Sequence, residues 1–520
     1  MNSKITSRLL IATTLVFPCL IWAYLDKSVW FWDPAMYGLE AIRMWRYLMF
    51  EPSGYLHNMF TMIGAKAPMI CWVGQFFEPL GHLMRYEQAL LLMQIIFSAW
   101  MIVEVTRWKI FSSSLLTIIL GALLVASTPD FIFQSHFYFV ELSQAFGVLM
   151  TFGLYLRRKE LNVVYITCAY FALFFYLLGV KITSPCYIFF PTLGLLYECW
   201  MRRTEYHWRA LKQWPTKLCL ILAIVITTTV TIWYATNAMS IYAFAKNASS
   251  GGDALLYGHK ASLLVKFQHW LPYFCNLFFG GRTRDIFIAL IGLCFIGRFR
   301  KIIDQPFCFA IAQVALLMLA VCLQINEETR YIYPLLAYWV YIFGRIIVKQ
   351  PKWLLVVFIC ILAFRWVEIN LATLGVWPLN TWMPWSDTID TKGTYLNQAH
   401  VILEKTVDGH NPKPIVIGVE LRQLNANLLQ FKYFTQHRDA VQNYPIYSIG
   451  YAQNSIDKAM ENIKQLQGEY LITQPQSLLK TLNDPWNRVS LNLALRLQKA
   501  GWRTFATGPD YLILKKPTDN

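Results

Sequence analysis

Five ionisable side chains of this 520-residue chain lie in or beside strongly apolar segments. A charge is energetically costly there unless it is paired or has a function. The five residues are Asp33, Lys66, Glu141, Lys181 and Arg330. A carboxylate held in such a setting can accept a proton from a bound group. A lysine or arginine there can hold an anion. These residue types are therefore candidates for acid–base chemistry and for anion binding.

Arg330 has the clearest ligand preference of the five. It stands in the sequence NEETRYIYPLL, a very short turn between two apolar stretches, and a guanidinium group binds phosphate bidentately. The alternative is a local ion pair with Glu327 or Glu328. Glu141 and Lys181 interrupt apolar runs near their outer ends, and they could likewise form a structural ion pair.

Asp33 and Lys66 each have an ordinary structural alternative. Asp33 precedes Pro34 at the start of an expected helix, which is typical of an N-cap followed by proline at the first helical position. Lys66 lies in the sequence GAKAPM, where its long side chain could simply reach from an apolar surface to water.

The elements that must position these residues are membrane-spanning helices. The chain is 56% apolar and only 15% charged, whereas soluble domains carry about 25% charged residues. The high apolar and aromatic content also excludes intrinsic disorder. We predict about eleven spans of near-membrane length. They cover residues 9–25, 87–105, 111–127, 137–156, 162–180, 183–200, 217–236, 285–297, 306–325, 331–348 and 352–370, of which 285–297 is short enough to be partly re-entrant.

The formal net charge of +16 is explained by topology. With the N-terminus in the cytoplasm and alternating spans, the cytoplasmic segments hold eighteen lysines and arginines against three acids. This asymmetry follows the positive-inside rule. We therefore expect a multi-pass plasma (inner) membrane protein with its N-terminus in the cytoplasm. The excess of basic residues is a topological signal and gives no reason to expect a nucleic-acid partner.

Two domains are expected, a membrane domain at 1–375 and an extracytoplasmic α/β domain at 376–520. The second contains no cysteine and no membrane-length apolar run. Its strands at 414–420, 444–450 and 469–474 alternate with helices at 424–434, 455–466 and 489–501, and a hairpin through Phe505 and 511–515 closes it. This alternation is typical of a small α/β sandwich with parallel strands. We expect the domain to serve docking or acceptor recognition.

Two outer loops, 26–86 and 237–284, are too long to be simple connectors. The first contains WFWDPAMYGLEAIRMWRYLMF, which predicts an amphipathic helix at the membrane interface. The second contains the aromatic stretch HWLPYFCNLFFGG. Such outer-leaflet surfaces suit a lipid-linked ligand, and an aromatic belt is the simpler alternative for most of these residues.

Short motifs in this order resemble those of the GT-C membrane glycosyltransferases, in the branch of the protein mannosyltransferases and the aminoarabinose transferase of lipid A. Asp33-Pro34-Ala35-Met36-Tyr37 is similar to the family's Asp-Glu-Ala-x-Tyr, and Lys66-Ala67-Pro68-Met69 to its Lys-Pro-Pro-Leu. Glu141 matches a second acid at the outer end of a later span. The family's Glu-x-Arg-Tyr-x-x-x-Pro is matched by Glu328, Arg330, Tyr331 and Pro334. Pro34 stands where the family has a second acid, and Glu141 where aspartate is more usual.

The resemblance implies an enzyme that moves a sugar from a polyprenyl-phosphate donor, usually with inversion, to an acceptor on the outer face. The acceptor would be lipid A or lipopolysaccharide core, another glycan or a protein. Asp33 would then be the catalytic base, with Glu141 orienting the acceptor or holding a partner base. Lys66, Arg330 and Lys181 would bind the donor phosphate. Tyr37, Tyr331 and His57 are candidates for substrate contacts, and His136 lies near these motifs without an assigned role. A divalent metal is a candidate cofactor whose ligands the sequence does not identify.

Three other classes of function remain as alternatives to this enzyme. A transporter or flippase for a lipid-linked saccharide would favour internal repeats and charges at the membrane midplane, and the two halves of the chain show no repeat. A polysaccharide polymerase or ligase would share the aromatic outer surface. A receptor-like module would need the spans only as an anchor, and eleven spans exceed that need.

Overall fold

The computed structural model describes residues 3–206, 208–377, 389–407, 412–442, 444–450, 453–480, 482 and 484–517. It divides into two compact units. The first comprises Met1–Tyr24, Leu56–Val73 and Gln88–Ile389, and the second comprises Leu25–Tyr55, Gly74–Glu87 and Asp390–Asn520. The first outer loop is therefore divided between the units, with most of it in the same unit as the C-terminal α/β domain.

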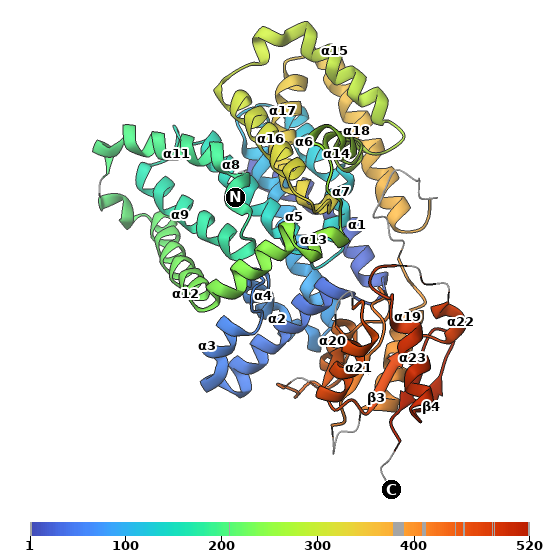
Figure 1. The fold of residues 1–520 in the computed structure, drawn as a ribbon. Coiled ribbons are helices and arrows are strands. Elements are labelled where there is room, and N and C mark those ends of the chain that lie inside the picture. Colours follow the sequence, from blue (N-terminus) through green and yellow to red (C-terminus); the bar gives the residue numbers. More distant parts are fainter. Residues whose placement is uncertain are drawn as a thin grey trace. The chain divides into compact units, whose positions relative to one another are not determined.

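Unit 1 is helical (Figure 1). The helices that lie wholly or mostly in it are α1 (Ser3–Leu25), α3 (Pro52–Thr61), α4 (Met69–Gly74), α5 (Tyr86–Arg107), α6 (Leu115–Ala126), α7 (Pro129–Ser135), α8 (Val140–Leu156), α9 (Val163–Val180), α10 (Ser184–Tyr187), α11 (Phe189–Met201), η2 (Arg203–Glu205), η3 (Trp208–Lys212), α12 (Trp214–Ser250), α13 (Gly252–Leu256), α14 (Leu263–Phe279), α15 (Arg284–Ile302), α16 (Gln305–Leu323), η4 (Thr329–Leu335), α17 (Leu336–Val348) and α18 (Lys352–Thr373).

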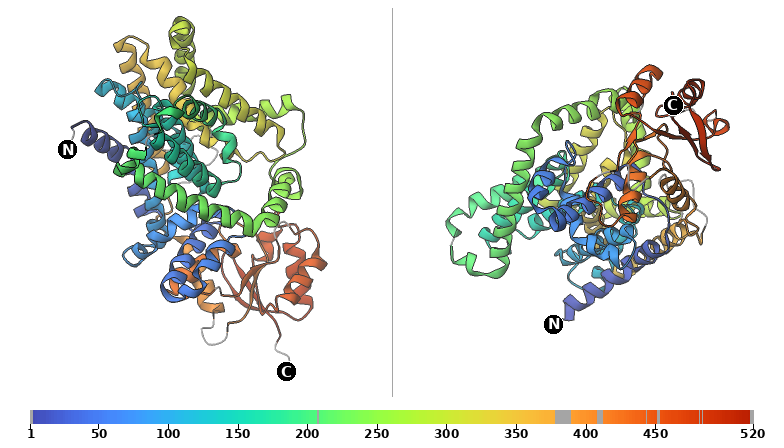
Figure 2. Two further views of the ribbon diagram at one scale, coloured as in Figure 1. Left: turned by 90° about the vertical axis from the view of Figure 1, so that its left-hand side faces the viewer. Right: turned by 90° about the horizontal axis from the view of Figure 1, so that it is seen from below.

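Each of the eleven predicted spans falls on one of these helices or on a pair of them. Within the described residues, seven helices are long and apolar enough to cross a membrane, and the pair α6 and α7, bent by 66°, would add an eighth. The short predicted span 285–297 lies within α15, which has a break in helical geometry at Arg298 and is not among the seven. Helix α12 continues well beyond its predicted end and is one long helix in both views of Figure 2.

Helix starts in unit 1 follow capping chemistry. Ser114 and Thr117 form a reciprocal capping box at the start of α6, and Asn162 accepts a hydrogen bond from the Val164 amide at the start of α9. Asp304 caps α16 through the Phe307 amide at 2.9 Å. Such caps satisfy amides that have no partner within the helix, so polar residues between the apolar runs set where these helices begin.

Unit 2 contains the α/β domain, drawn in orange and red in Figure 1, and the helices α2 and η1 from the first outer loop. Its elements are α2 (Trp32–Phe50), η1 (Gln75–His82), α19 (Thr394–Thr406), β1 (Ile415–Ile417), α20 (Ala426–Gln436), β2 (Ile446–Ser448), α21 (Ile456–Gln465), β3 (Tyr470–Thr473), α22 (Gln476–Leu479), α23 (Ser490–Lys499), β4 (Arg503–Thr507) and β5 (Leu512–Lys515).

The sheet of unit 2 has the strand order β2-β1-β3-β5-β4. Strand β1 pairs in parallel with β2 and β3, whereas β5 pairs antiparallel with β3 and β4. Parallel pairing is possible because helices α20 and α21 cross between the strands. The predicted strands, helices and closing hairpin are therefore present. Helices α19 and α22 are additional elements that were not predicted.

Helix α2 packs against α20 and is largely buried, with Ala35, Ala41 and Ile42 fully inaccessible to solvent. Arg46 is 1% exposed and donates hydrogen bonds to three carbonyl oxygens at the end of α20, those of Phe434, His437 and Ala440, at 3.0, 3.0 and 3.1 Å. A cation is favourable at a helix C-terminus because the unpaired carbonyls carry partial negative charge. The amphipathic helix expected at the membrane interface is thus packed on the α/β domain.

The close approach of α2 and α20 depends on Gly38. A Cβ atom at this position would lie 2.8 Å from the Trp30 ring and 2.9 Å from the Phe431 ring. The two rings stack with centroids 5.2 Å apart, so neither can move aside without disturbing the other.

We predict that Gly38→Ala lowers the melting temperature of the purified protein, because overpacking a buried contact costs about 1–3 kcal/mol. Gly292→Ala is the matched control, since this helical glycine has no atom within 4 Å of the added Cβ. The measurement is thermal unfolding in detergent. An equal or higher melting temperature for Gly38→Ala would show that α2 and α20 are not tightly packed.

Candidate functional site

Three of the predicted site residues meet in unit 1. Lys181 Nζ donates a hydrogen bond to Glu141 Oε1 at 2.9 Å, and Arg330 Nε lies 3.5 Å from the same oxygen. Arg330 Nε also lies 2.7 Å from Oε2 of Glu328. Both ion pairs that the sequence left open, Glu141 with Lys181 and Arg330 with Glu328, are therefore present in one cluster. We call these four residues the Glu141 cluster.

Two of these charges, Glu141 and Lys181, lie at helix ends that favour their sign. Glu141 lies in the first turn of α8, and Lys181 is the residue that follows the last turn of α9. Negative charge is favourable at a helix N-terminus and positive charge at a C-terminus. The start of α8 therefore meets the end of α9, and the two helices run antiparallel. Arg330 comes from the short 3-10 helix η4 between α16 and α17.

Because Glu141 is buried, this carboxylate and the two cations beside it depend on one another for charge compensation. Glu141 is 1% exposed, whereas the side chains of Lys181 and Arg330 are 20% and 24% exposed. Without a carboxylate between them the two cations would repel each other. The second carboxylate oxygen, Glu141 Oε2, makes no hydrogen bond among the described residues. The cluster thus presents two partly exposed cations around a buried anion, which is an arrangement suited to an incoming phosphate.

Aromatic rings line the cations of the cluster. Lys181 Nζ lies 4.2 Å from the centre of the Tyr331 ring, and the Arg330 guanidinium lies 5.2 Å from the Phe139 ring. Tyr187 donates a hydrogen bond to the Tyr331 carbonyl at 2.5 Å, which ties η4 to α10. A cation over an aromatic face is stabilised by the ring's quadrupole. Tyr331, predicted as a substrate contact, is part of this site.

Lys66 and the two predicted histidines occupy other parts of unit 1. Lys66 lies in the half-buried bend between α3 and α4. His57 has an exposed side chain on α3. His136 is 3% exposed and stacks on Trp22 with ring centroids 4.3 Å apart, so its contacts within the described residues are those of a packed core residue.

Asp33 and Tyr37 lie on α2 in unit 2. Helix α2 begins at Trp32 with Phe31 as its N-cap residue, so Asp33 is inside the first turn. The ordinary alternative, in which Asp33 caps the helix and Pro34 is its first residue, is therefore not what the structure shows. Tyr37 lies one turn further along α2 and is 5% exposed.

Glu40 is a carboxylate of α2 that is not among the predicted site residues. It is 7% exposed, and both of its oxygens accept hydrogen bonds from Arg43 Nη1 at 3.1 Å. Burial raises the pKa of Glu40 to about 7, although the Arg43 charge opposes the shift. The helix that carries Asp33 therefore contains an acid that titrates near neutral pH.

Asp130 and Arg365 are two further buried charges that we did not predict. Asp130 is 2% exposed on α7 and accepts a hydrogen bond from Gln134 at 3.3 Å. Arg365 is 1% exposed on α18 and donates to the carbonyl oxygens of Ser127 and Phe278 at 3.1 and 2.8 Å. An isolated charge within an apolar run was the available signal in both cases.

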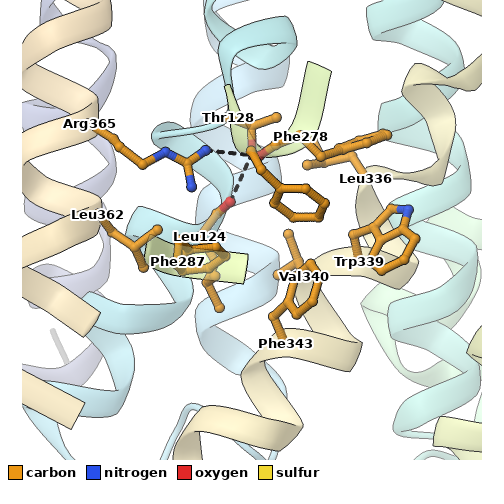
Figure 3. Close-up of a pocket in the computed structure, with 11 residues that line it drawn as sticks. Leu124, Thr128, Phe278, Phe287, Leu336, Trp339, Val340, Phe343, Leu362 and Arg365 are labelled. Atoms are coloured by element: carbon orange, nitrogen blue, oxygen red, sulfur yellow. Dashed lines mark hydrogen bonds between the residues drawn. The ribbon is translucent and has the colours of Figure 1, made fainter. Parts of the chain in front are cut away.

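Arg365 stands at one end of an aromatic pocket (Figure 3). The pocket is small, with a cavity volume of about 10 Å³, and is lined mainly by Phe278, Phe287, Trp339 and Phe343. Ligand sites usually measure about 300–1,000 Å³, so a lipid-linked sugar does not fit. Because its guanidinium binds carbonyls at the ends of α6 and α14, we interpret Arg365 as a structural link between these helices.

A second ion cluster flanks the same turn as Arg330. Lys266, which is 2% exposed, lies 2.6 Å from Oε1 of Glu327, and His259 lies 3.1 Å from Oε2. The neighbouring acids Glu327 and Glu328 thus bind different partners. Among the described residues, no group of three or more histidine, cysteine, aspartate or glutamate side chains is arranged to hold a metal ion.

Solved structures with a similar fold exist for this chain. No family model and no curated protein sequence matches this chain. The crystal structure of ArnT from Cupriavidus metallidurans bound to undecaprenyl phosphate matches with a TM-score of 0.57 at 13% sequence identity, over 98% of both chains. The apo structure of the same protein matches with a TM-score of 0.53 at 13% identity, over 97% of both chains. The chain therefore has the fold of the GT-C membrane glycosyltransferases and is a multi-pass membrane protein.

We predict that Glu141→Gln destabilises the protein, because removing one partner of a buried ion pair leaves the others uncompensated, at a cost of about 3–5 kcal/mol for a fully buried pair and less for these partly exposed cations. The double variant Glu141→Gln with Lys181→Met should recover part of the loss, since it removes one unpaired cation. Thermal unfolding of the three proteins measures the effect. A double variant less stable than Glu141→Gln alone would contradict the shared role of this carboxylate.

We predict that stability falls as the pH rises from about 5 to about 8, and that Glu40→Gln reduces this fall. The folded protein holds the Glu40 proton more tightly than the unfolded chain does, so the stabilisation is complete below the unfolded pKa and is lost as the pH passes about 7. Melting temperatures of both proteins across this pH range provide the measurement. Equal slopes would show that Glu40 does not titrate in this range.

Proposed function

We propose that this chain is a glycosyltransferase that moves a sugar from a polyprenyl-phosphate-linked donor to an acceptor of the cell envelope at the outer face of the membrane. The acceptor class comprises lipid A or lipopolysaccharide core, other glycans and proteins. The observation that carries the proposal is the Glu141 cluster, because it places two cations at the ends of membrane helices in a chain with the GT-C fold.

The cluster suits the phosphate of a lipid-linked donor. Arg330 offers a planar fork of N–H donors and Lys181 a compact ammonium group, and both are partly exposed. The similar ArnT structure contains undecaprenyl phosphate. We assign phosphate binding to Arg330 and Lys181, with Lys66 as a further contributor. Glu141 has the role of holding the two cations together.

The proposed reaction is a single displacement at the anomeric carbon. The Asp33 carboxylate accepts the proton of the acceptor hydroxyl, and the oxygen of that hydroxyl forms a new bond to the anomeric carbon. The bond from that carbon to the phosphate oxygen breaks, and polyprenyl phosphate leaves with the electron pair. A base positioned in this way contributes about 10²–10⁴-fold to the rate. We assign stabilisation of the charge that develops on the phosphate to Arg330 and Lys181.

The expected orientation follows from the charge distribution. The basic residues between spans place the N-terminus in the cytoplasm. An odd number of spans then puts the C-terminal α/β domain outside, which in a Gram-negative envelope is the periplasm. The proposed reaction and orientation require two partners, the membrane lipids and the polyprenyl-phosphate donor.

We predict that Asp33→Asn reduces sugar transfer at least about 100-fold, because the amide cannot accept the acceptor proton. The readout is transfer from a polyprenyl-phosphate sugar, followed by mass spectrometry of envelope glycans and lipids. Asp457→Asn is the matched control, since Asp457 also lies in the first turn of a helix of unit 2 and its side chain is 83% exposed. Near-normal transfer by Asp33→Asn would remove this residue as the base.

We also predict that Arg330→Ala weakens binding of polyprenyl phosphate about 10- to 100-fold, since hydrogen bonds to charged groups contribute about 1.5–3 kcal/mol. Arg496→Ala is the control, because Arg496 forms an exposed ion pair with Asp457 in the other unit. Binding is measured with the detergent-solubilised protein and the lipid phosphate. Unchanged affinity for the Arg330 variant would place the phosphate elsewhere.

A further inference from the structure

We propose that Glu420 of the α/β domain is a positioning residue for the base Asp33 and acts through Trp32. The proposal rests on the function proposed above, in which Asp33 accepts the acceptor proton. All the residues involved belong to unit 2. The α/β domain would then take part in catalysis as well as in docking, because it would set the orientation of the helix turn that carries the base.

The backbone at Trp32 is the first observation. This residue has a φ of +21° and directly precedes Asp33. Positive φ is rare for residues with a large side chain, because Cβ then crowds the backbone. Such strain costs about 1–3 kcal/mol and persists only when surrounding contacts hold it, most often at functional sites. The contacts that hold Trp32 therefore also fix the start of α2.

Three contacts from residues 420–427, which follow β1 and include the first turn of α20, hold this turn. Trp32 Nε1 donates a hydrogen bond to Glu420 Oε2 at 3.2 Å, and Asn427 Nδ2 donates to the Trp32 carbonyl oxygen at 3.2 Å. The Arg422 guanidinium lies 4.2 Å from the centre of the Phe31 ring. The two residues immediately before Asp33, Phe31 and Trp32, are thus bound by residues 420–427 of the α/β domain.

Glu420 is itself held rigidly. It is 8% exposed, and its other carboxylate oxygen accepts a hydrogen bond from Ser448 at 2.5 Å. Asn487 accepts a hydrogen bond from the Glu420 amide at 2.8 Å and donates one to its carbonyl at 3.1 Å. Asp484 in turn accepts from Asn487 at 3.0 Å. Supporting contacts of this kind keep a site residue within the narrow geometry that chemistry requires.

The location of Glu420 is typical of functional residues in open α/β sheets. Glu420 follows the carboxyl end of β1, Ser448 is the last residue of β2, and these strands are parallel neighbours. In such sheets, ligands bind at the carboxyl ends of the strands, near the point where the connections diverge. In the strand order β2-β1-β3 the connections diverge between β1 and β3, so Glu420, which follows β1, lies beside this point.

The test compares Trp32→Phe, Glu420→Leu and the double variant in the full-length protein. Trp32→Phe keeps an aromatic ring and removes the indole N–H donor. Misplacing a reacting group by about 1 Å costs about 100-fold in rate. We therefore expect each single variant to lower kcat about 10- to 100-fold, with the KM for the polyprenyl-phosphate sugar unchanged. The double variant should be no slower than the slower single one, because both changes break the same link.

Glu420→Gln is the conservative variant that should retain most of the activity, because its amide oxygen can still accept the indole hydrogen bond. Glu469→Leu is the matched control, since Glu469 precedes β3, is paired with Lys413 and is not in the segment that contacts α2. We expect its kcat to be unchanged. Melting temperatures of all variants show which changes act through unfolding.

The outcomes separate this proposal from the one on which it rests. If Asp33→Asn is inactive while Trp32→Phe and Glu420→Leu keep their kcat, the positioning role is wrong and the base assignment stands. If Asp33→Asn is active, the base assignment is wrong, and the positioning role falls with it. A kcat for the double variant equal to the product of the two single losses would also overturn the link through Trp32.

Discussion

The buried carboxylate of Glu141 is the interaction on which the candidate phosphate site depends. One of its oxygens lies within 3.5 Å of both Lys181 and Arg330, which come from different elements far apart in the sequence. Two cations of this kind do not gather in an apolar environment unless an anion lies between them. The ends of α8 and α9 and the turn η4 are therefore arranged around a single acid, and the partly exposed faces of the two cations remain directed at what we propose is the lipid phosphate.

In the second unit, contacts with the α/β domain hold a helix from the first outer loop in a defined position. Helix α2 is fixed along α20 by Gly38, which permits close packing, and by Arg46, which binds the carbonyls at the end of α20. At its start, Trp32 and Phe31 contact the segment after β1. Asp33 thus lies on a helix that is held at both ends by the α/β domain. The sequence suggests that the α/β domain is a separate module. In the structure, its side chains and backbone contact the helix that carries the proposed base.

Much of this architecture was predictable because its signals are local. Apolar runs of membrane length, basic residues between them and alternating strands and helices after residue 376 predicted the helices and the sheet that the structure shows. The ion pairs of Glu141 and Arg330 were among the expected alternatives. The packing of α2 on α20 was not predictable, because it joins residues almost 400 positions apart and its polar contacts are mostly with backbone carbonyls. Asp130 and Arg365 are charged residues within apolar runs, a pattern that indicates buried charges. Neither residue was predicted.

The proposed role of the Glu141 cluster is to bind the phosphate of a polyprenyl lipid. A cryo-electron microscopy structure of the protein with bound polyprenyl phosphate would locate that group. We expect phosphate density within hydrogen-bonding distance, about 2.7–3.2 Å, of both Lys181 Nζ and the Arg330 guanidinium. Phosphate density away from both cations, with the Lys181–Glu141–Arg330 contacts unchanged, would show that the cluster does not bind the phosphate.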